Sequence, residues 1–397
     1  MSMPSTSIFV IVLFYLPGYK TGGPLRSISN IVEHFGDQFQ FYILTKDRDW
    51  TDAAAYPNVT QDAWNDVGRA KVFYASHFSF RLLRRLLAEV VPAAVYLNSV
   101  FSPLTIRVLC MRRLGIIPRI PVILAPRGEL AESALATKKL KKRCYLWFAR
   151  KAGLYNGITW HANWVQEANE IRRTMTHESN IHLAPNIPKV FDPVARMSEK
   201  AKGSLRIVFL SRIGPVKNLL FALQILPSLV GDVVFDIYGP IDQKSYWAAC
   251  EKTIVSLPAQ VKVNYKGPVH YGDVAATLSC YHFLLLPTTG ENFGHVIVEA
   301  LSVGCPVIIS NCTRWRNLQT RAAGWDLPLN DRSRWSAVLQ HCVEMGDAEY
   351  RSLSEGAQRV AKEQDSSHAI LSTRQLFEAA IAGNVVTEAI GTPVRSE

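Results

Sequence analysis

The sequence contains no apolar run that approaches the roughly 20 residues a membrane-spanning helix needs. The best candidate, Ile8 to Leu16, is too short to span a bilayer. The uncharged stretch before it, Met1 to Ser7, lacks the basic start of a secretory signal. We therefore expect Ile8 to Leu16 to be a buried strand.

Cysteine is scarce and shows no metal-type spacing. The seven cysteines are odd in number, and Cys305 and Cys312 flank a predicted strand rather than closing a zinc knuckle. We expect no metal site and reduced thiols in a cytoplasm. The cysteines stand at positions 110, 144, 250, 280, 305, 312 and 342.

Acidic residues are too few in the first half of the chain to balance its basic ones. Residues 1–200 hold 26 Lys or Arg and 15 Asp or Glu, whereas residues 201–397 hold 18 of each, so the first half carries the whole net charge of +11. The densest basic stretch, 138–151, has apolar residues interleaved. This pattern suits an anionic membrane surface, and a solvated helix face is the alternative. We expect no nucleic-acid partner, because the chain has no recognition motif or stacking array.

Short apolar segments alternate with helical or turn segments along most of the chain, which favours mainly parallel sheets covered on both faces. A polar link, Pro185 to Gly203, interrupts the alternation and predicts two doubly wound domains. We expect one domain at 1–188 and another at 204–365, followed by a helix at 366–382. The tail from Asn384 is predicted to be disordered. The expected strands are Ile8–Leu16, Phe39–Leu44, Lys71–Tyr74, Ala94–Asn98, Val122–Ala125, Gly157–His161, Leu205–Ser211, Val233–Tyr238, Val261–Tyr265, Phe283–Pro287 and Val307–Ser310.

The most informative segment is Pro287 to Ser310, PTTGENFGHVIVEALSVGCPVIIS. It predicts a loop and then a helix from about Gly294 to Val303, with Glu291 in the loop and Glu299 in the helix. Amides at the start of such a helix favour an anion such as a diphosphate. The two carboxylates are spaced to hold opposite ends of a bridged ligand, as a nucleotide sugar is.

This segment resembles the signature of glycosyltransferase family 4, the retaining, sugar-nucleotide-dependent enzymes of the GT-B fold. Further similar settings lie in the same order over some 300 residues. The resemblance implies two Rossmann-like domains with a cleft between them and a last helix, 366–382, that crosses back to the first domain. The settings include Tyr15 to Pro24, Pro126 to Leu130, His161-Ala162, Pro185 to Pro188, Ser211 to Ile213 with Lys217-Asn218, and Gly324-Trp325.

The resemblance also implies residue roles. Glu291 would contact the donor sugar near the reacting carbon, and Arg212 and Lys217 would offset the charge of the departing diphosphate without a metal ion. Glu299 would accept hydrogen bonds from ribose hydroxyls, with a structural ion pair as the alternative. The remaining expected donor contacts are Gly22, Gly23, Asn292, Phe293 and Gly294.

Arg127 stands where many relatives of the family have a histidine. Its guanidinium is permanently charged, so it is no general base at neutral pH. We expect it to take part in catalysis or to bind a donor or acceptor phosphate, with Glu129 as its neighbour. His161 is expected to line the acceptor cleft, although a histidine satisfied at a strand end is an equal alternative.

These expectations add up to a retaining glycosyltransferase that moves a sugar from a UDP- or GDP-linked donor to a glycan or lipid-linked acceptor in surface polysaccharide biosynthesis. We expect no other cofactor. The acceptor would bind the basic first domain, and the protein would lie at the inner face of the plasma membrane. The alternatives are a nucleotide-sugar epimerase of the same fold and a non-catalytic protein that binds nucleotide sugars.

Overall fold

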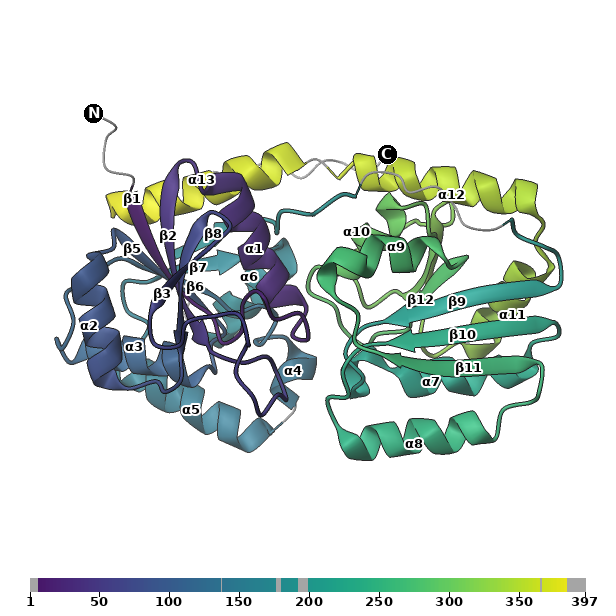
Figure 1. The fold of residues 1–397 in the computed structure, drawn as a ribbon, viewed down its shortest axis with the longest axis horizontal. Coiled ribbons are helices and arrows are strands. Elements are labelled where there is room, and N and C mark those ends of the chain that lie inside the picture. Colours follow the sequence, from purple (N-terminus) through teal and green to yellow (C-terminus); the bar gives the residue numbers. More distant parts are fainter. Residues whose placement is uncertain (1–5, 137, 176–179, 192–198, 365, 384–397) are drawn as a thin grey trace.

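The structure is a computed structural model of the chain, and it describes residues 6–136, 138–175, 180–191, 199–364 and 366–383. Two α/β lobes stand side by side, each with its own sheet (Figure 1). The expected fold class, two doubly wound lobes, is confirmed. The expected domain limits at residues 188, 204 and 365 stay a prediction.

The first lobe is built on an eight-stranded sheet in the order β3-β4-β2-β1-β5-β6-β7-β8. Every neighbouring pair is parallel except β3 and β4. The strands are β1 (Thr6–Ile11), β2 (Phe39–Lys46), β3 (Trp64–Val67), β4 (Ala70–Ala75), β5 (Ala94–Asn98), β6 (Val122–Ala125), β7 (Thr159–Ala162) and β8 (Asn180–Leu183).

Both faces of this sheet are buried, because side chains alternate along each strand. In β1, Phe9 and Ile11 belong to one apolar cluster, and Ile8 and Val10 belong to the cluster on the other face. Ser79 and Ser102 cap α2 and α3 by accepting hydrogen bonds from backbone N–H groups. The helices are α1 (Gly23–Phe35), α2 (Phe80–Val90), α3 (Pro103–Arg113), α4 (Glu132–Ala136), α5 (Lys139–Lys151) and α6 (Val165–Thr174).

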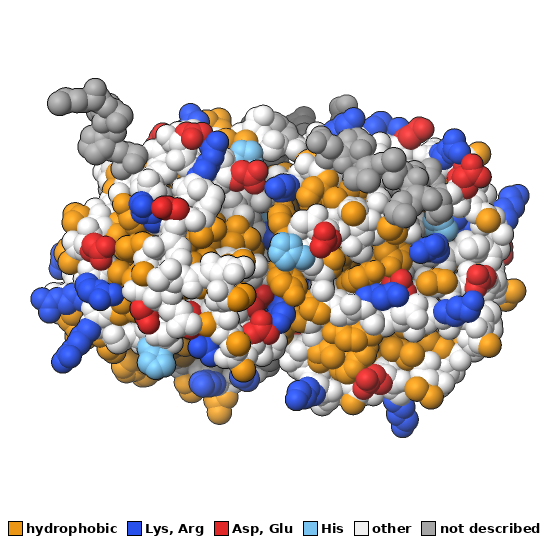
Figure 2. Space-filling model, in the orientation of Figure 1, with side chains coloured by type: hydrophobic (Ala, Val, Ile, Leu, Met, Phe, Trp, Pro, Cys, Tyr) orange, Lys and Arg blue, Asp and Glu red, His pale blue; other side chains and the backbone are white. Residues whose placement is uncertain are grey.

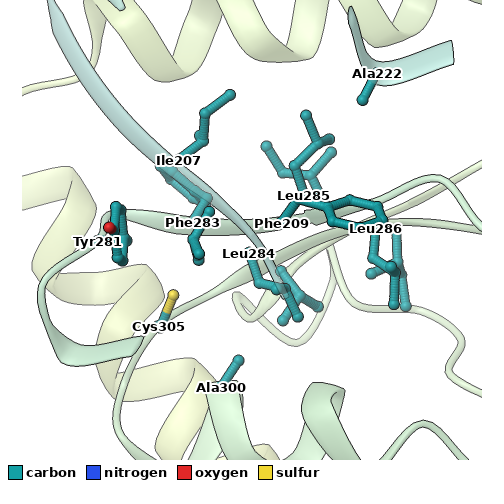
Figure 3. Packing of buried hydrophobic residues seen from close by; sticks show 14 of the residues in the cluster. Ile207, Phe209, Ala222, Tyr281, Phe283, Leu284, Leu285, Leu286, Ala300 and Cys305 are labelled. Atoms are coloured by element: carbon teal, nitrogen blue, oxygen red, sulfur yellow. The ribbon is translucent and has the colours of Figure 1, made fainter. Parts of the chain in front are cut away.

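The second lobe has a six-stranded, all-parallel sheet in the order β11-β10-β9-β12-β13-β14. Its central strands are β9, which is apolar from Ile207 to Leu210, and β12, which is wholly apolar; Figure 3 shows the packing of Ile207, Phe209 and Leu284 to Leu286. The strands are β9 (Ser204–Leu210), β10 (Asp232–Tyr238), β11 (Val261–Gly267), β12 (Phe283–Leu286), β13 (Val307–Ser310) and β14 (Gly324–Leu327). The helices are α7 (Leu219–Ile225), α8 (Lys244–Val255), α9 (Val274–Ser279), α10 (His295–Ser302), α11 (Arg332–Glu344) and α12 (Asp347–Lys362).

The last helix, α13 (Ser366–Ala382), packs against the first lobe, while α12 lies over the second (Figure 1). The Phe377 ring of α13 lies 5.6 Å from the rings of Phe39 and Tyr96, centroid to centroid. His182 Nε2 in β8 lies 3.1 Å from the carbonyl oxygen of Ser372 in α13. The last described helix, α13, therefore packs on the first lobe although it follows the second lobe in sequence.

Some expected strand limits were wrong. The first strand ends at Ile11 rather than Leu16, because the chain leaves the sheet there and Val12 to Phe14 line the space between the lobes. The short strands β3, β8 and β14 were not predicted, because each mixes polar with apolar residues, unlike the mainly apolar four-residue strands β6 and β13. The tail from Asn384 and residues 192–198 of the expected link lie outside the described residues. Among the described helices, none is long and apolar enough to cross a membrane.

Candidate active site between the two lobes

A cleft of about 450 Å³ lies between the lobes and is lined by both. Most of its lining comes from loops that follow the carboxyl ends of parallel strands, the usual position of ligand sites in doubly wound sheets. Side chains of both charge signs lie along the boundary between the lobes on the face shown in Figure 2. Of the residues predicted from sequence, the lining includes Gly22, Gly23, Arg127, Glu129, Arg212, Lys217, Glu291, Asn292 and Phe293.

The amino-terminal end of α10 faces this cleft. Asn292 and Phe293 precede the helix, and they and His295 line the cleft. Gly294 caps the helix with φ +80°, where a Cβ would lie 2.8 Å from Ile297 Cδ1. A residue without a side chain is therefore needed at this turn. Backbone N–H groups at the start of a helix have no partner within the helix, and this is the feature that anion sites at helix starts use.

Lys217 and Glu291 form an ion pair inside the cleft, and each side chain is only 16% exposed. Lys217 ends a short helical turn that follows β9, and Glu291 lies in the loop after β12. Arg212 has a different environment. Its guanidinium lies 5.8 Å from the ring centre of Trp50 in the other lobe. Within the described ranges, no carboxylate forms an ion pair with Arg212.

Glu299 does not line the cleft. It is 1% exposed and forms an ion pair with Arg26 of α1, which does line the cleft. Burial raises the pKa of Glu299, and the Arg26 charge opposes that shift. The Arg26 guanidinium also lies 4.9 Å from the ring centre of Tyr271. The alternative role for Glu299, a structural ion pair, is therefore present in this state of the protein, and the ribose contact stays a prediction.

A second contact between the lobes lies beside this pair. Ser27 Oγ of α1 is 3.1 Å from His295 Nε2 of α10. Burial and the nearby Arg26 and Arg127 charges lower the pKa of His295 to about 3. The imidazole is therefore neutral near pH 7 and adds no charge to the cleft.

Arg127 is held by neutral partners. Its Nε donates to Asn98 Oδ1 at 3.0 Å, and its Nη2 donates to the Tyr96 hydroxyl at 2.8 Å. Its Nη1 donates to Asn186 Oδ1 at 2.7 Å and to Asn163 Oδ1 at 3.4 Å. Sequence reasoning missed these four residues. Asn98 ends a predicted parallel strand, and a polar residue at the carboxyl end of such a strand is a signal of a ligand site that could have identified it.

The Arg127-Gly128 turn is fixed by a buried carboxylate that sequence reasoning also missed. Glu167 in the first turn of α6 accepts hydrogen bonds from the backbone N–H of Gly128 at 2.6 Å and of Asn163 at 2.8 Å. Asn292 Nδ2 of the second lobe lies 3.3 Å from the same carboxylate. Both Arg127 and Gly128 have positive φ, +57° and +79°. A Cβ on Gly128 would lie 3.3 Å from Asn292 Cβ, so the two lobes meet closely at this turn.

Glu129 lines the cleft, but its oxygens already accept hydrogen bonds. The donors are Ser99 Oγ at 2.7 Å and the N–H groups of Val100 and Phe101 at 2.8 and 3.2 Å. Burial raises its pKa, and these hydrogen bonds oppose the shift. Glu129 therefore holds the loop of Ser99 to Phe101, which follows β5, against the turn that carries Arg127.

His161 lies outside the cleft lining, as does Gly294. Its Nδ1 is 2.6 Å from the Tyr96 hydroxyl and its Nε2 is 2.8 Å from the carbonyl oxygen of Ala184. Burial and the Arg127 charge lower the pKa of His161 to about 3. His161 therefore reaches the cleft only through Tyr96 and Arg127, and its contact with an acceptor stays a prediction. In the described part of the chain, no three His, Cys, Asp or Glu side chains are grouped to hold a metal ion.

Parts of the chain are similar in sequence to known glycosyltransferases. Residues 192–322 match the family model described as "Glycosyl transferases group 1". A 181-residue stretch is 27% identical to a D-inositol 3-phosphate glycosyltransferase from Jonesia denitrificans, covering 43% of this chain and 42% of that protein. A 103-residue stretch is 24% identical to the O-antigen chain mannosyltransferase RfbU from Salmonella typhimurium, covering 26% of this chain and 29% of that protein. The matched stretches thus span less than half of either relative.

Solved glycosyltransferase structures share the whole fold. Sucrose-phosphate synthase from Thermosynechococcus elongatus superposes with a TM-score of 0.74 at 15% identity, covering 96% of this chain and all of that one. WaaG, a glycosyltransferase involved in lipopolysaccharide biosynthesis, gives 0.67 at 13% identity, with 96% and 100% coverage. Anabaena HepE in complex with UDP-glucose gives 0.65 at 15% identity, with 95% and 99% coverage. The chain therefore has the GT-B fold.

Proposed function

We propose that this protein is a retaining glycosyltransferase of family 4 that takes its sugar from a nucleoside diphosphate sugar. The observation that carries the proposal is the single cleft in which Arg212, Lys217 and Glu291 meet the amino-terminal end of α10. The match of residues 192–322 to a glycosyltransferase family model supports it, because that segment supplies all three side chains. The two cations suit a diphosphate leaving group, and the carboxylate of Glu291 suits the sugar attached to it.

The proposed reaction breaks the bond between the anomeric carbon and the diphosphate. Negative charge then builds on the departing phosphate, where Arg212, Lys217 and the α10 amides would stabilise it more strongly than in the ground state. Glu291 would face the electron-poor sugar carbon. The leaving phosphate oxygen itself would take the proton of the acceptor hydroxyl, so no separate general base and no metal ion are required.

We propose that the acceptor is a glycan or lipid-linked glycan used to build a bacterial surface polysaccharide. Two of the similar proteins support this, since one is named for O-antigen chains and the other for lipopolysaccharide biosynthesis. The acceptor would enter along the first lobe, where Arg127 and Glu129 line the cleft. Arg127 would contact substrate directly, whereas His161 would act through Tyr96.

We also propose that α5 docks the protein on an anionic membrane at the cytoplasmic face. Four residues at positions i, i+4, i+7 and i+8 of this helix, Leu140, Cys144, Trp147 and Phe148, are all exposed. The two aromatic side chains are 62% and 64% exposed. Exposed basic residues flank this apolar stripe, and they complement anionic lipid headgroups, each at about 1 kcal/mol. The exposed basic residues of α5 are Lys139, Lys141, Arg143, Arg150 and Lys151.

Vesicle flotation tests the membrane proposal. Vesicles with 30% anionic lipid should recruit the protein, and the double variant Trp147→Ser, Phe148→Ser should lose most of this binding. A matched double change at two exposed apolar positions of the second lobe, Val230→Ser and Val255→Ser, should leave it intact. Equal recruitment to neutral and anionic vesicles, or equal effects of the two double variants, would overturn membrane docking through α5.

Donor turnover tests the enzymatic proposal. Among UDP, GDP and ADP sugars, the sugars of one nucleotide should stabilise the folded protein by a few kcal/mol at saturation if their affinity is micromolar. Glu291→Ala should keep nucleotide binding and lose sugar transfer. Release of an epimerised donor without an acceptor would instead show an epimerase. A protein that binds the donor but turns none over with any glycan acceptor would be a non-catalytic binder.

A further inference from the structure

The Arg127 guanidinium touches no carboxylate of the residues that the structure describes. It has five N–H groups, and four of them donate to neutral oxygens of Asn98, Asn163, Asn186 and Tyr96. Among the described residues, no acidic side chain lies within ion-pair distance of it. One N–H on Nη2 is left without a partner in this part of the chain. Four hydrogen bonds therefore fix the position of the Arg127 guanidinium, and none of them comes from a group that neutralises its charge.

The orientation of Asn98 follows from this contact. A guanidinium only donates, so the Asn98 atom facing Arg127 Nε must be Oδ1. The amide Nδ2 is therefore fixed on the other side, and it has no hydrogen-bond partner among the described residues. Asn98 is only 4% exposed, and it lines the cleft. A buried donor without a partner carries a desolvation cost, which a ligand oxygen can recover.

Two carboxylates near this corner are already engaged. Glu129 accepts from Ser99 and two backbone N–H groups, and Glu167 accepts from two backbone N–H groups and the amides of Asn163 and Asn292. Both therefore hold the wall in place rather than offering an oxygen to the guanidinium. Their charges still weaken the positive field that a ligand meets at this corner.

We infer that Asn98 and Arg127 form a subsite for an oxyanion, a carboxylate or a phosphate ester, carried by one of the two sugar substrates. The inference rests on the proposed glycosyltransferase function and adds the substrate class. This oxyanion is distinct from the donor diphosphate, whose proposed partners Arg212 and Lys217 belong to the other lobe. The substrate is then an anionic sugar, such as a uronic acid in the donor or a phosphorylated sugar in the acceptor.

The charge of Arg127 is the reason to assign an oxyanion rather than a sugar hydroxyl. A hydroxyl oxygen accepts a hydrogen bond, but it leaves the guanidinium charge uncompensated while the substrate displaces water from around it. A carboxylate or phosphate presents two or more oxygens, so it can accept from the guanidinium and from Asn98 Nδ2 together. Charge-assisted hydrogen bonds of this kind contribute roughly twice as much as neutral ones.

Paired probes test the subsite. In the donor arm, calorimetry compares UDP-glucuronic acid with UDP-glucose, and GDP-mannuronic acid with GDP-mannose. In the acceptor arm, it compares glucose 6-phosphate with glucose, on protein saturated with whichever of UDP, GDP or ADP binds. We expect the anionic probe to bind at least tenfold tighter than its neutral partner in one arm. The arm that shows the preference identifies which substrate carries the oxyanion.

The variant Asn98→Asp then removes the Nδ2 donor and gives Arg127 a carboxylate partner of nearly the same shape. It should reduce the preference at least fivefold, as should Asn98→Ala. Asn169→Asp, which makes the same charge change on an exposed face of α6, should preserve it. Binding of the plain nucleoside diphosphate should survive in all three variants.

A preference below tenfold in both arms, or one that persists in Asn98→Asp and Asn98→Ala, overturns the oxyanion subsite. The proposed transferase function stands in that case, provided that a nucleoside diphosphate still binds the wild-type protein. If none of the three nucleoside diphosphates binds, the proposed function fails first, and the subsite inference fails with it.

Discussion

Glu291 competes with the donor diphosphate for Lys217. The two side chains form an ion pair inside the cleft, and each is only 16% exposed. A hydrogen bond to a charged group contributes about 1.5–3 kcal/mol. A phosphate that binds Lys217 shares its charge with Glu291, so Glu291 should weaken binding of a nucleoside diphosphate that carries no sugar.

The variant Glu291→Gln should therefore tighten binding of the plain nucleoside diphosphate while abolishing sugar transfer. The Gln amide oxygen still accepts a weaker hydrogen bond from Lys217, so we expect a gain of about 1–2 kcal/mol rather than the full amount. This corresponds to a roughly five- to thirtyfold lower Kd. Calorimetric titration with the best-binding nucleoside diphosphate measures it, and Glu355→Gln on the exposed face of α12 is the control for charge.

A double-mutant cycle distinguishes competition for Lys217 from a general effect of the Glu291 charge on the diphosphate. If Lys217 mediates the effect, Glu291→Gln should tighten binding much less in a Lys217→Gln background. An unchanged or higher Kd in Glu291→Gln would refute the reasoning, because the carboxylate would then not oppose the diphosphate. An equal gain in both backgrounds would show that Lys217 is not the shared partner.

Two further predictions concern buried groups. Arg26→Leu leaves the Glu299 carboxylate buried and unpaired between the lobes, so it should cost about 3–5 kcal/mol in stability or open the lobes. Denaturant unfolding and small-angle scattering should show this, and adding Glu299→Leu should restore at least half of the loss. His161 and His295 have their pKa values lowered to about 3, below the ordinary 6.5, so folding favours the neutral rings and stability falls as pH drops below 6.5. Between pH 7 and pH 5 each histidine should lower the free energy of unfolding by about 2 kcal/mol. The variant His295→Gln should remove about half of the combined loss. If its free energy of unfolding depends on pH as that of the wild type does, the burial argument is contradicted.

The sequence was sufficient to predict the fold because its strands are short, apolar and separated by regular helical segments. The strands β5, β6 and β13 have the predicted limits, and so does α13. Of the four edge strands, β11 was predicted and β3, β8 and β14 were missed. These three strands mix polar with apolar residues over four positions, so they lack the continuous apolar run that identified β6 and β13.

The candidate site was predictable where it depends on one continuous segment. Glu291 to Phe293, Arg212 and Lys217 all line the cleft, and their roles there stay predictions. Contacts between the lobes were not predictable. Arg26 meets Glu299 across 273 positions of sequence, and Asn292 meets Glu167 across 125, and no local pattern records such a pairing.

The polar cage around Arg127 was missed for the same reason. Its four acceptors come from three separate segments: Tyr96 and Asn98 are in β5, Asn163 follows β7, and Asn186 follows β8. Only the sheet order, which places β5, β6, β7 and β8 next to one another, brings these residues together.

The central claim is that one cleft between the lobes holds a nucleoside diphosphate. An experimental structure of the protein with its best-binding nucleoside diphosphate tests this most directly. We predict that the diphosphate oxygens lie within hydrogen-bond distance of Arg212, Lys217 and the first backbone N–H groups of α10. A nucleotide bound with its diphosphate outside this cleft, and out of reach of both cations, would contradict the account.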